Sequence, residues 1–319
     1  MLAAPSAALG SAPVSVIIPV YRGAAFLRRL LPALARQDLP PSRILVIDSS
    51  SDDGSAAYAA EQGCRVHTIP KADFNHGGTR NLGARLALAE AGGTHGILVF
   101  MTQDAVPEDQ AFLARLIAPL RSGEAVLSYA RQVAHPDAWI GERFGREALY
   151  GPQRELRRPA DMPRLGARAF FCSNVAAAVR ADDFLRLGGF PEDVIMCEDR
   201  VLCARVLAAG GSVAYCADAV VRHSHDYTTI QQFRRYFDNG VFQRDQDEPA
   251  RGLAGDGLRF ALGQWLACWR SGGWQPAARS ALHSAAKLLG LLAGRRYHWI
   301  PVAARRRLSL HAYHWQQRR

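Results

Sequence analysis

The first hundred residues alternate short apolar runs with segments of helical periodicity, and this alternation limits the possible folds more than any other feature. Apolar runs rich in β-branched residues favour strands, and apolar side chains spaced three and four apart favour amphipathic helices. Buried strands that alternate with helices predict an α/β fold with a mostly parallel central sheet flanked by helices. We expect strands at residues 14–21, 44–47, 66–70 and 96–101, and helices at 24–37, 55–62 and 79–91.

Polar loops follow three of these strands, at residues 19–23, 48–54 and 103–107. Ligands of α/β sheets bind at the carboxyl ends of the strands, so we expect Asp48, Asp52 and Asp104 to surround one crevice. Beyond a further strand at 126–129, residues 135–168 are rich in Arg and Pro and predict an irregular, flexible segment on the acceptor side. Order is expected to return with residues 170–180, with helices from Asp182 and Cys197, and with an edge strand made of residues 212–215 and 220–223.

The formal net charge of +10 is concentrated at the C-terminal end of the chain. Residues 251–319 contain twelve Lys and Arg against one acidic residue, whereas residues 1–250 contain 27 basic and 28 acidic residues. Trp and Arg both favour the headgroup region of a bilayer, so this basic, Trp-rich tail suits an anionic membrane surface, and we expect no nucleic-acid partner. The alternative is a pair of solvated basic helices. The tryptophans of the tail are Trp265, Trp269, Trp274, Trp299 and Trp315.

The same division predicts the domain organisation: a disordered N-terminus at 1–13, one α/β domain at 14–250 and a helical basic C-terminal extension at 251–319. No run reaches the roughly 18 to 20 apolar residues of a spanning helix, and the first residues do not resemble a signal peptide. The six cysteines include no C-x-x-C pair, which indicates neither a zinc cluster nor a disulfide framework. We expect a cytoplasmic protein, bound peripherally to the inner face of the cell membrane.

Four motifs occur in the order typical of one enzyme family: VSVIIPVY at 14–21, VIDSSSDDG at 46–54, TRNLG at 79–83 and the pair Glu198-Asp199. With them, residues 14 to about 245 resemble family-2 glycosyltransferases, which have the GT-A type nucleotide-diphospho-sugar transferase fold. FNHGGTRN at 74–81, TQDAVP at 102–107, GRRYH at 294–298 and LSLH at 308–311 resemble the bacterial rhamnosyltransferase subgroup. The resemblance implies inverting transfer of L-rhamnose from dTDP-L-rhamnose to a hydroxyl of a glycan or lipid-linked glycan acceptor, as in surface-polysaccharide synthesis.

The resemblance assigns the nucleoside of the donor to the ends of the first two strands. Pro19, Tyr21, Asp48 and Asp52 would contact it, and a carboxylate is suited to accepting hydrogen bonds from a base or a ribose. The alternative for residues 48–54 is an ordinary turn and helix cap, which Asp, Ser and Gly also favour.

Arg80 and Asn81 begin an expected helix that follows the glycine-rich run at 75–78. Backbone N–H groups, the helix dipole and the Arg80 guanidinium could converge there on the anionic diphosphate of the donor. Asn81 is expected to fix the loop of the same nucleotide-sugar site. A glycine-rich turn with a surface arginine is the alternative.

Asp104 lies where the family places an Asp-x-Asp metal site, and its carboxylate is a ligand that Mg²⁺ or Mn²⁺ accepts. Gln103 departs from that pattern, because a neutral amide replaces a carboxylate and leaves the dependence on a divalent cation open. We assign Gln103 to the nucleotide-sugar site. His223, chosen over His225, matches the late histidine that reaches the diphosphate or the metal in this family. A turn aspartate and a solvated histidine are the alternatives.

Glu198 and Asp199 begin another expected helix, where carboxylates also serve as caps. Inverting transfer needs one base, which takes the proton of the acceptor hydroxyl. The resemblance assigns Asp199 as this base, with Glu198 in support. Three other functions stay open: a UDP-hexose donor, a nucleotidyltransferase and a non-catalytic nucleotide-sugar-binding module. A nucleotidyltransferase usually has a glycine-rich phosphate loop after the first strand, which this chain lacks. The presence of both Asp104 and Asp199 weighs against a non-catalytic module.

Overall fold

The computed structural model describes residues 9–10, 12–246 and 253–317. The chain divides into two compact units. The first, here called the sheet unit, comprises residues 1–132, 151–192 and 198–223, and the second, the helical unit, comprises 133–150, 193–197 and 224–319. The predicted boundary at residue 250 falls between 247 and 252, outside the described residues, and stays a prediction.

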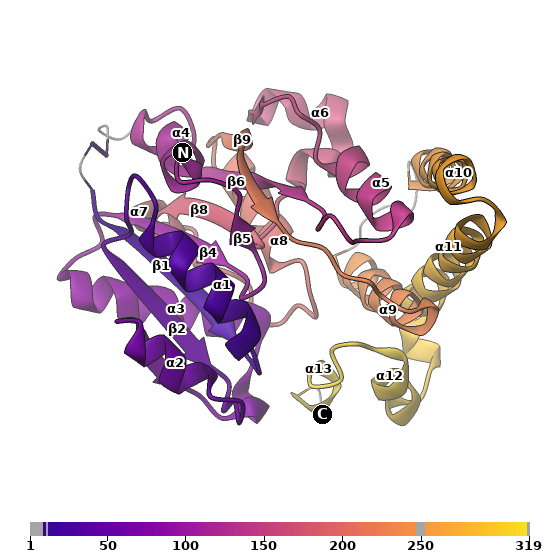
Figure 1. Ribbon diagram of the computed structural model, residues 1–319, viewed down its shortest axis with the longest axis horizontal. Helices are drawn as coiled ribbons and strands as arrows, with labels where there is room; N and C mark the ends of the chain where they lie inside the picture. Colours follow the sequence, from indigo (N-terminus) through magenta and orange to yellow (C-terminus); the bar gives the residue numbers. More distant parts are fainter. Residues whose placement is uncertain (1–8, 11, 247–252, 318–319) are drawn as a thin grey trace. The chain divides into compact units, whose positions relative to one another are not determined.

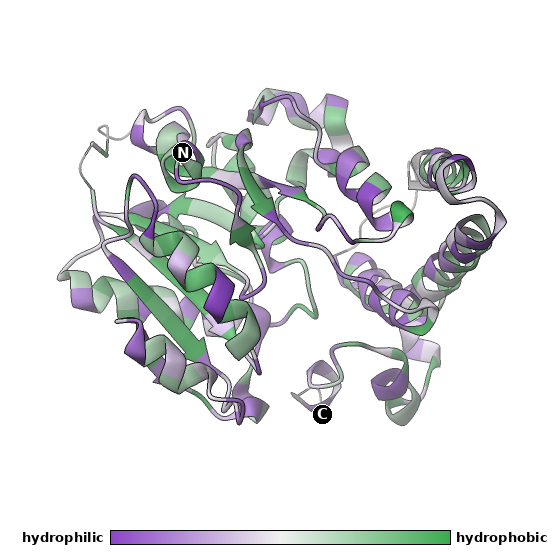
Figure 2. Cartoon of the chain, viewed as in Figure 1, coloured by the Kyte–Doolittle hydropathy of each residue, from purple (hydrophilic) through white to green (hydrophobic). Residues whose placement is uncertain are grey.

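The sheet unit contains a nine-stranded sheet, counted over the described residues, in the order β3-β2-β1-β4-β8-β6-β9-β5, with β7 paired to β9 (Figure 1). The strands β3, β2, β1 and β4 are parallel, whereas β8 pairs antiparallel with β4 and β6, and β9 pairs antiparallel with β5 and β7. The central strands are hydrophobic along their length (Figure 2). Their bounds are β1 (Val14–Val20), β2 (Arg43–Asp48), β3 (Arg65–Thr68), β4 (Ile97–Met101), β5 (Val106–Pro107), β6 (Leu127–Val133), β7 (Glu155–Arg157), β8 (Ala176–Arg180) and β9 (Val213–Arg222).

Successive side chains of a strand point to opposite faces of the sheet, and helices cover both faces, so the strands are buried on both sides. The leucines of α1 pack with Val16 and Ile18 of β1 in one core cluster, which α4 also joins. On the other face α3 lies so close to β1 that a Cβ added at Gly83 would collide with Ile17. The helices of this unit are α1 (Ala24–Ala35), α2 (Ser55–Glu61), α3 (His76–Ala91), α4 (Phe112–Arg121), α6 (Met162–Leu165), α7 (Ala181–Arg186) and α8 (Glu198–Ala208).

The helical unit is built around close contact between α9 and α11. Gly240, Gly290 and Gly294 lie at this contact, where an added Cβ would collide with backbone of the opposite helix. The fully buried carboxylate of Asp238 accepts the backbone N–H groups of Leu310 (2.9 Å) and His311 (3.2 Å), which ties the LSLH segment to α9. The helices of this unit are α5 (Ile140–Leu149), α9 (Thr229–Asp245), α10 (Leu253–Gly272), α11 (Trp274–Arg295), α12 (Val302–Leu308) and α13 (His314–Gln317).

The predicted α/β fold with flanking helices and a helical C-terminal region is confirmed, and the sheet is parallel in one half and antiparallel in the other. The expectation of irregular chain at 135–168 is wrong, because this stretch contains α5, whose Phe144 packs against Phe260 of α10 at 5.5 Å between ring centroids. Of residues 1–13, Leu9 and Ala12 are buried in the core, and 1–8 and 11 lie outside the described part. Within that part, no helix combines the length and hydropathy needed to cross a bilayer.

Candidate functional site

Asp48, the last residue of β2, places a buried carboxylate beside the end of β1, where Val20 is its register partner. Its Oδ2 accepts the N–H of Ser51 (2.9 Å), while its Oδ1 is buried without a hydrogen-bond partner. An unsatisfied buried acceptor costs free energy, so this oxygen is suited to an N–H or O–H group of a ligand. Pro19 lies half-buried in β1 opposite Ile47.

Two cations that the sequence analysis does not assign lie beside Tyr21. The Tyr21 hydroxyl accepts a hydrogen bond from Lys71 Nζ (2.6 Å), and this ammonium is 4.2 Å from the centre of the ring. Arg22 donates two hydrogen bonds to Asp52, of 2.8 and 2.6 Å, and this contact lowers the pKa of the Asp52 carboxyl. Lys71 therefore adds positive charge at the exposed edge of the predicted nucleoside site, which suits an anionic ligand, whereas Asp52 offsets the charge of Arg22.

Gln103 contacts the backbone of Tyr21 twice. The Tyr21 N–H donates to Gln103 Oε1 (3.0 Å), and Gln103 Nε2 donates to the Tyr21 carbonyl (3.2 Å). Gly23 leaves the room for this amide, since an added Cβ would collide with it. A carboxylate could accept the first bond but could not donate the second. The amide at this position thus joins the loops after β4 and β1.

Asp104 and His223 approach each other with 3.5 Å between Oδ2 and Nε2. Nδ1 of the buried His223 ring lies 3.0 Å from Gln132 Oε1, and Gln132 Nε2 donates to Ser173 Oγ (2.8 Å). A hydrogen bond from Nδ1 to the Gln132 oxygen orients the ring, and the tautomer that makes this bond has Nε2 free to bind a metal ion.

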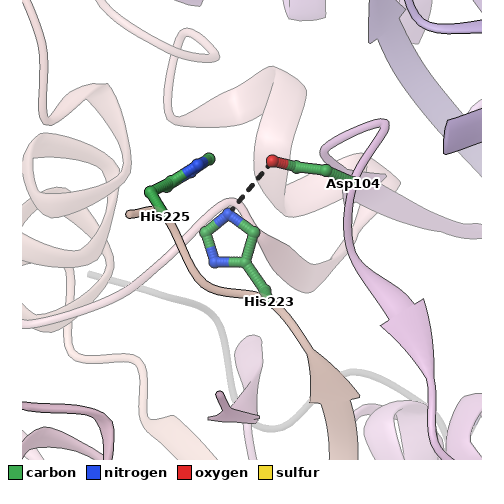
Figure 3. A group of neighbouring side chains, drawn as sticks. All are labelled: Asp104, His223 and His225. Atoms are coloured by element: carbon green, nitrogen blue, oxygen red, sulfur yellow. Dashed lines mark ion pairs between the residues drawn. The ribbon is translucent and has the colours of Figure 1, made fainter. Parts of the chain in front are cut away.

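His225 follows two residues later and joins the same group (Figure 3). One ligand atom from each of Asp104, His223 and His225 lies within 4.8 Å of the others, the one such group among the described residues. One carboxylate oxygen and two imidazole nitrogens form a donor set that suits a divalent transition-metal ion. The sequence analysis chose His223 over His225, whereas the structure brings both histidines to this group.

The two carboxylates at the start of α8 lie in different surroundings. Glu198 is 5% exposed, pairs with Arg80 at 3.1 Å and accepts a hydrogen bond from Asn174 Nδ2 (3.0 Å). Asp199 accepts the backbone N–H groups of Asn174 (3.0 Å) and Arg200 (2.8 Å). Burial, and next the charge of Glu198, raise the pKa of Asp199 to about 6. A carboxyl with such a pKa is matched to proton transfer near neutral pH.

Arg80 and Asn81 lie in the interior of the sheet unit. Besides its pair with Glu198, Arg80 donates to the His76 carbonyl (3.0 Å) and is 4% exposed. Asn81 donates to the Phe190 carbonyl and accepts the Phe190 N–H, both at 2.9 Å, so that it holds the loop at 190–192. The predicted contact of these two side chains with a donor stays a prediction.

Backbone strain falls beside or between predicted site residues at three places. The non-glycine residues with positive φ in the described part are Arg22 (48°), Ser50 (55°) and Cys197 (64°). They lie next to Tyr21, between the two aspartates of the 48–54 loop, and directly before Glu198. Such conformations cost about 1–3 kcal/mol each and persist where the surrounding structure enforces them, often at functional sites.

Residues 173–175, which the sequence analysis does not assign, contact three parts of the site. Ser173 accepts from Gln132, Asn174 binds both carboxylates of α8, and the Val175 carbonyl accepts the N–H of Thr102 (3.1 Å). No local motif marks this segment. Its one sequence signal is its place directly before the apolar strand β8, which pairs with β4.

Residues 15–188 match the family model described as glycosyl transferase family 2. The O-antigen chain rhamnosyltransferase RfbN of Salmonella typhimurium is 34% identical over 311 residues, which cover 95% of this chain and 96% of that protein. The O-antigen chain rhamnosyltransferase WbaN of Salmonella anatum is 36% identical over 310 residues, with coverage of 94% and 95%.

Two solved structures share the fold at low sequence identity. The mannosyltransferase PcManGT of Pyrobaculum calidifontis, in complex with GDP-Man and Mn²⁺, has a TM-score of 0.57 and 18% identity, and the match covers 93% of this chain and 88% of that one. S. aureus TarS 1-349, in complex with UDP-GlcNAc, has a TM-score of 0.54 and 14% identity, with coverage of 93% and 84%. The GT-A expectation for the fold is confirmed.

Loss of the Gln103 amide should loosen the Tyr21 loop. We expect Gln103→Ala to weaken dTDP binding by roughly three- to tenfold, because two hydrogen bonds to the loop are lost. Gln103→Glu should weaken it similarly, because its carboxylate would face the Tyr21 carbonyl. Isothermal titration calorimetry measures the affinity, with Gln110→Ala, an exposed glutamine outside the site, as the control. Wild-type affinity in both Gln103 variants would show that the loop is held by other contacts.

Proposed function

Because this chain belongs to glycosyl transferase family 2, we propose that it is an inverting rhamnosyltransferase acting in O-antigen synthesis. L-Rhamnose from dTDP-L-rhamnose would be transferred to a hydroxyl of the growing, lipid-linked glycan. The observation that carries this proposal is similarity over nearly the whole chain to two O-antigen chain rhamnosyltransferases. A UDP-hexose donor is the alternative, because it would use the same family motifs.

We assign binding of the nucleotide-sugar donor to the loops after β1, β2 and β4. The unpartnered Oδ1 of Asp48 would accept a hydrogen bond from the base, and Pro19, Tyr21 and Asp52 would border the nucleoside. Lys71 lies beside Tyr21 and could reach the phosphates. Gln103, Arg80 and Asn81 would act as positioning residues, holding the Tyr21 loop, Glu198 and the loop at 190–192.

A divalent cation would be held by Asp104, His223 and His225. When bound, it would neutralise the negative charge that develops on the leaving diphosphate. Imidazole ligands favour Mn²⁺ over Mg²⁺, which prefers oxygen ligands and retained water. The Nε2 of His223, which faces Asp104, and the single carboxylate fit this choice.

The acceptor half depends on Asp199. Its carboxylate would take the proton of the acceptor hydroxyl while that oxygen bonds to the anomeric carbon and the bond from this carbon to the diphosphate oxygen breaks. One displacement of this kind inverts the configuration. Glu198, buried and paired with Arg80, would hold the start of α8 in place and leave proton transfer to Asp199.

Asp199→Asn should abolish release of dTDP from dTDP-L-rhamnose in the presence of an acceptor, while dTDP affinity stays within a few-fold. In the wild-type protein, kcat/KM should fall as the pH drops below about 6, because protonated Asp199 cannot act as a base. Coupled detection of dTDP across pH measures both, with Asp218→Asn, an exposed carboxylate on β9, as the control. Turnover by Asp199→Asn, or faster release with UDP-glucose than with dTDP-L-rhamnose, would contradict the base or the donor.

Asp104→Ala and His223→Ala should each weaken Mn²⁺ binding at least tenfold, because each removes a ligand from a site with one carboxylate. Mn²⁺ should bind wild-type protein more tightly than Mg²⁺ does. Titration followed by the EPR signal of free Mn²⁺ measures the affinity in the presence of dTDP, with competition by Mg²⁺. The exposed His67→Ala serves as the control. Mn²⁺ affinity like that of the control in both variants would remove these residues from the cation site.

We further propose that the helical unit docks on an anionic membrane surface at the inner face of the cell membrane. Large apolar side chains are exposed along α10 at spacings of three to four residues and along α11 at positions 282, 288, 289 and 292, and the exposed Arg259 and Arg270 flank the α10 row. Burial of apolar area among headgroups, with about 1 kcal/mol for each nearby basic residue, would stabilise the contact. The side chains are Leu258, Leu262, Leu266 and Trp269 on α10, and Leu282, Leu288, Leu289 and Leu292 on α11.

Wild-type protein should sediment with phosphatidylglycerol-containing vesicles at low salt, less so at high salt, and weakly with neutral vesicles. The double change Leu282→Glu and Leu289→Glu should reduce this binding at least fivefold, because two carboxylates replace apolar groups of the α11 row. Leu149→Glu alters an exposed leucine of α5 and serves as the control. If wild-type protein does not bind anionic vesicles, or if the double variant binds them like wild type, the membrane proposal is wrong. The exposed rows would then pack on protein, and light scattering would detect a dimer.

A further inference from the structure

The helical unit contains a pocket of about 220 Å³ that the proposed chemistry does not use. Its volume lies below the ~300–1,000 Å³ of pockets for drug-sized ligands, so it suits a smaller group. An indole, a hydroxyl and three carboxyl groups line it. The lining residues are Asp137, Ala138, Trp139, Glu142, Ser224 and Asp226, all within this unit.

Contacts behind the pocket hold two of its walls. The Arg279 guanidinium lies 4.5 Å from the centre of the Trp139 ring and pairs with Asp226. Trp139 also packs edge-on against the buried His283 ring, with 5.2 Å between centroids. The indole is therefore fixed before any ligand arrives, which lowers the conformational entropy lost on binding.

The remaining walls are held in the same way. Glu142 accepts from Arg146 (2.9 Å) and from the backbone N–H of His225 (3.4 Å). Ser224 Oγ accepts the backbone N–H of His135 (3.1 Å). The chain that leaves β9 is thus attached to α5 and to the segment before it, and these elements present the polar lining.

The lining selects for a neutral, hydroxyl-rich ligand. Carboxylates accept hydrogen bonds from hydroxyl groups, and an indole packs against C–H groups, so together they match a sugar ring. Three carboxylates against Arg146 and Arg279 leave the lining negative, which disfavours phosphate or an acidic sugar. The pocket also differs from a metal site, because its acids do not form a group with ligand spacing among the described residues.

The pocket is linked through four consecutive residues to the proposed cation group, which consists of Asp104, His223 and His225. His223 and His225 belong to the cation group, and Ser224 and Asp226 line the pocket. Consecutive Cα atoms are about 3.8 Å apart, so the pocket begins one peptide away from the group assigned to the donor diphosphate. In a single displacement the acceptor sugar must lie directly beside the donor sugar. We infer that this pocket is an acceptor subsite that binds one neutral sugar unit of the glycan, an inference that rests on the proposed function.

Saturation-transfer NMR on the full-length protein, loaded with dTDP and diamagnetic Mg²⁺, tests the subsite with methyl glycosides of rhamnose, mannose, galactose and glucose, and with methyl glucuronide. At least one neutral glycoside should receive saturation, and the glucuronide should receive none. Asp137→Ala and Trp139→Phe should each reduce the signal at least fivefold while dTDP affinity is unchanged. Glu147→Ala, an exposed carboxylate on α5 outside the pocket, should keep it. Asp137 is exposed, so its removal spares the core, and circular dichroism verifies the fold of each variant.

The subsite is overturned if no neutral glycoside receives saturation from the wild-type protein, if the glucuronide binds as well, or if both pocket variants keep the wild-type signal. Failure of the proposed donor gives a different result. Protein that binds neutral glycosides in this Asp137-dependent way, yet releases no dTDP from dTDP-L-rhamnose, retains the subsite and loses the rhamnosyl donor.

Discussion

The buried ion pair between Arg80 and Glu198 is the constraint on which the arrangement of the site depends. Both side chains are almost fully removed from water, so each charge needs the other and the amide of Asn174 to offset its desolvation. Removing one partner of such a pair costs about 3–5 kcal/mol, because the other charge is left buried and uncompensated. The pair joins α3, which packs on the parallel strands, to α8. The pair would also separate the roles of two adjacent carboxylates, since Arg80 and Asn174 hold Glu198, whereas burial raises the pKa of Asp199 to about 6.

The antiparallel strand β8 brings the rest of the site to this pair. Because β8 lies directly beside β4, the residues before it meet the loop after β4, and the Val175 carbonyl accepts the Thr102 N–H. One residue earlier, Asn174 binds the α8 carboxylates, and Ser173 holds the glutamine that orients His223. In a uniformly parallel sheet the strand beside β4 would run in the opposite direction to β8, and the residues before it would lie at the other end of β4. The change of strand direction therefore allows one short segment to contact the cation group and the proposed base together.

The sequence was sufficient for features that depend on neighbours along the chain. The first four strands, the helices between them and the polar strand ends follow from local periodicity, and Asp48 and Asp104 lie in those strand-end loops. Features that depend on distant partners were not predictable in this way. The amide of Gln103 meets the backbone of Tyr21 across 82 residues, and Asn81 meets Phe190 across 109. α5 was missed although Ile140 and Phe144 have the four-residue spacing of an amphipathic helix, and that spacing does not reveal the partner of Phe144 on α10.

The segment at 223–226 connects the cation group, which is assigned to the donor, with the pocket, which is assigned to the acceptor. Its residues alternate along the chain between the cation group and the pocket, so a short stretch of chain joins the two. The other pocket residues, Asp137, Trp139 and Glu142, come from the chain around α5, which contributes nothing to the donor loops described above. Changes around α5 could therefore alter which sugar is accepted while Asp104 and His223 keep their geometry. A transferase built in this way can combine one donor site with different acceptors, because specificity for each substrate is encoded in a separate segment.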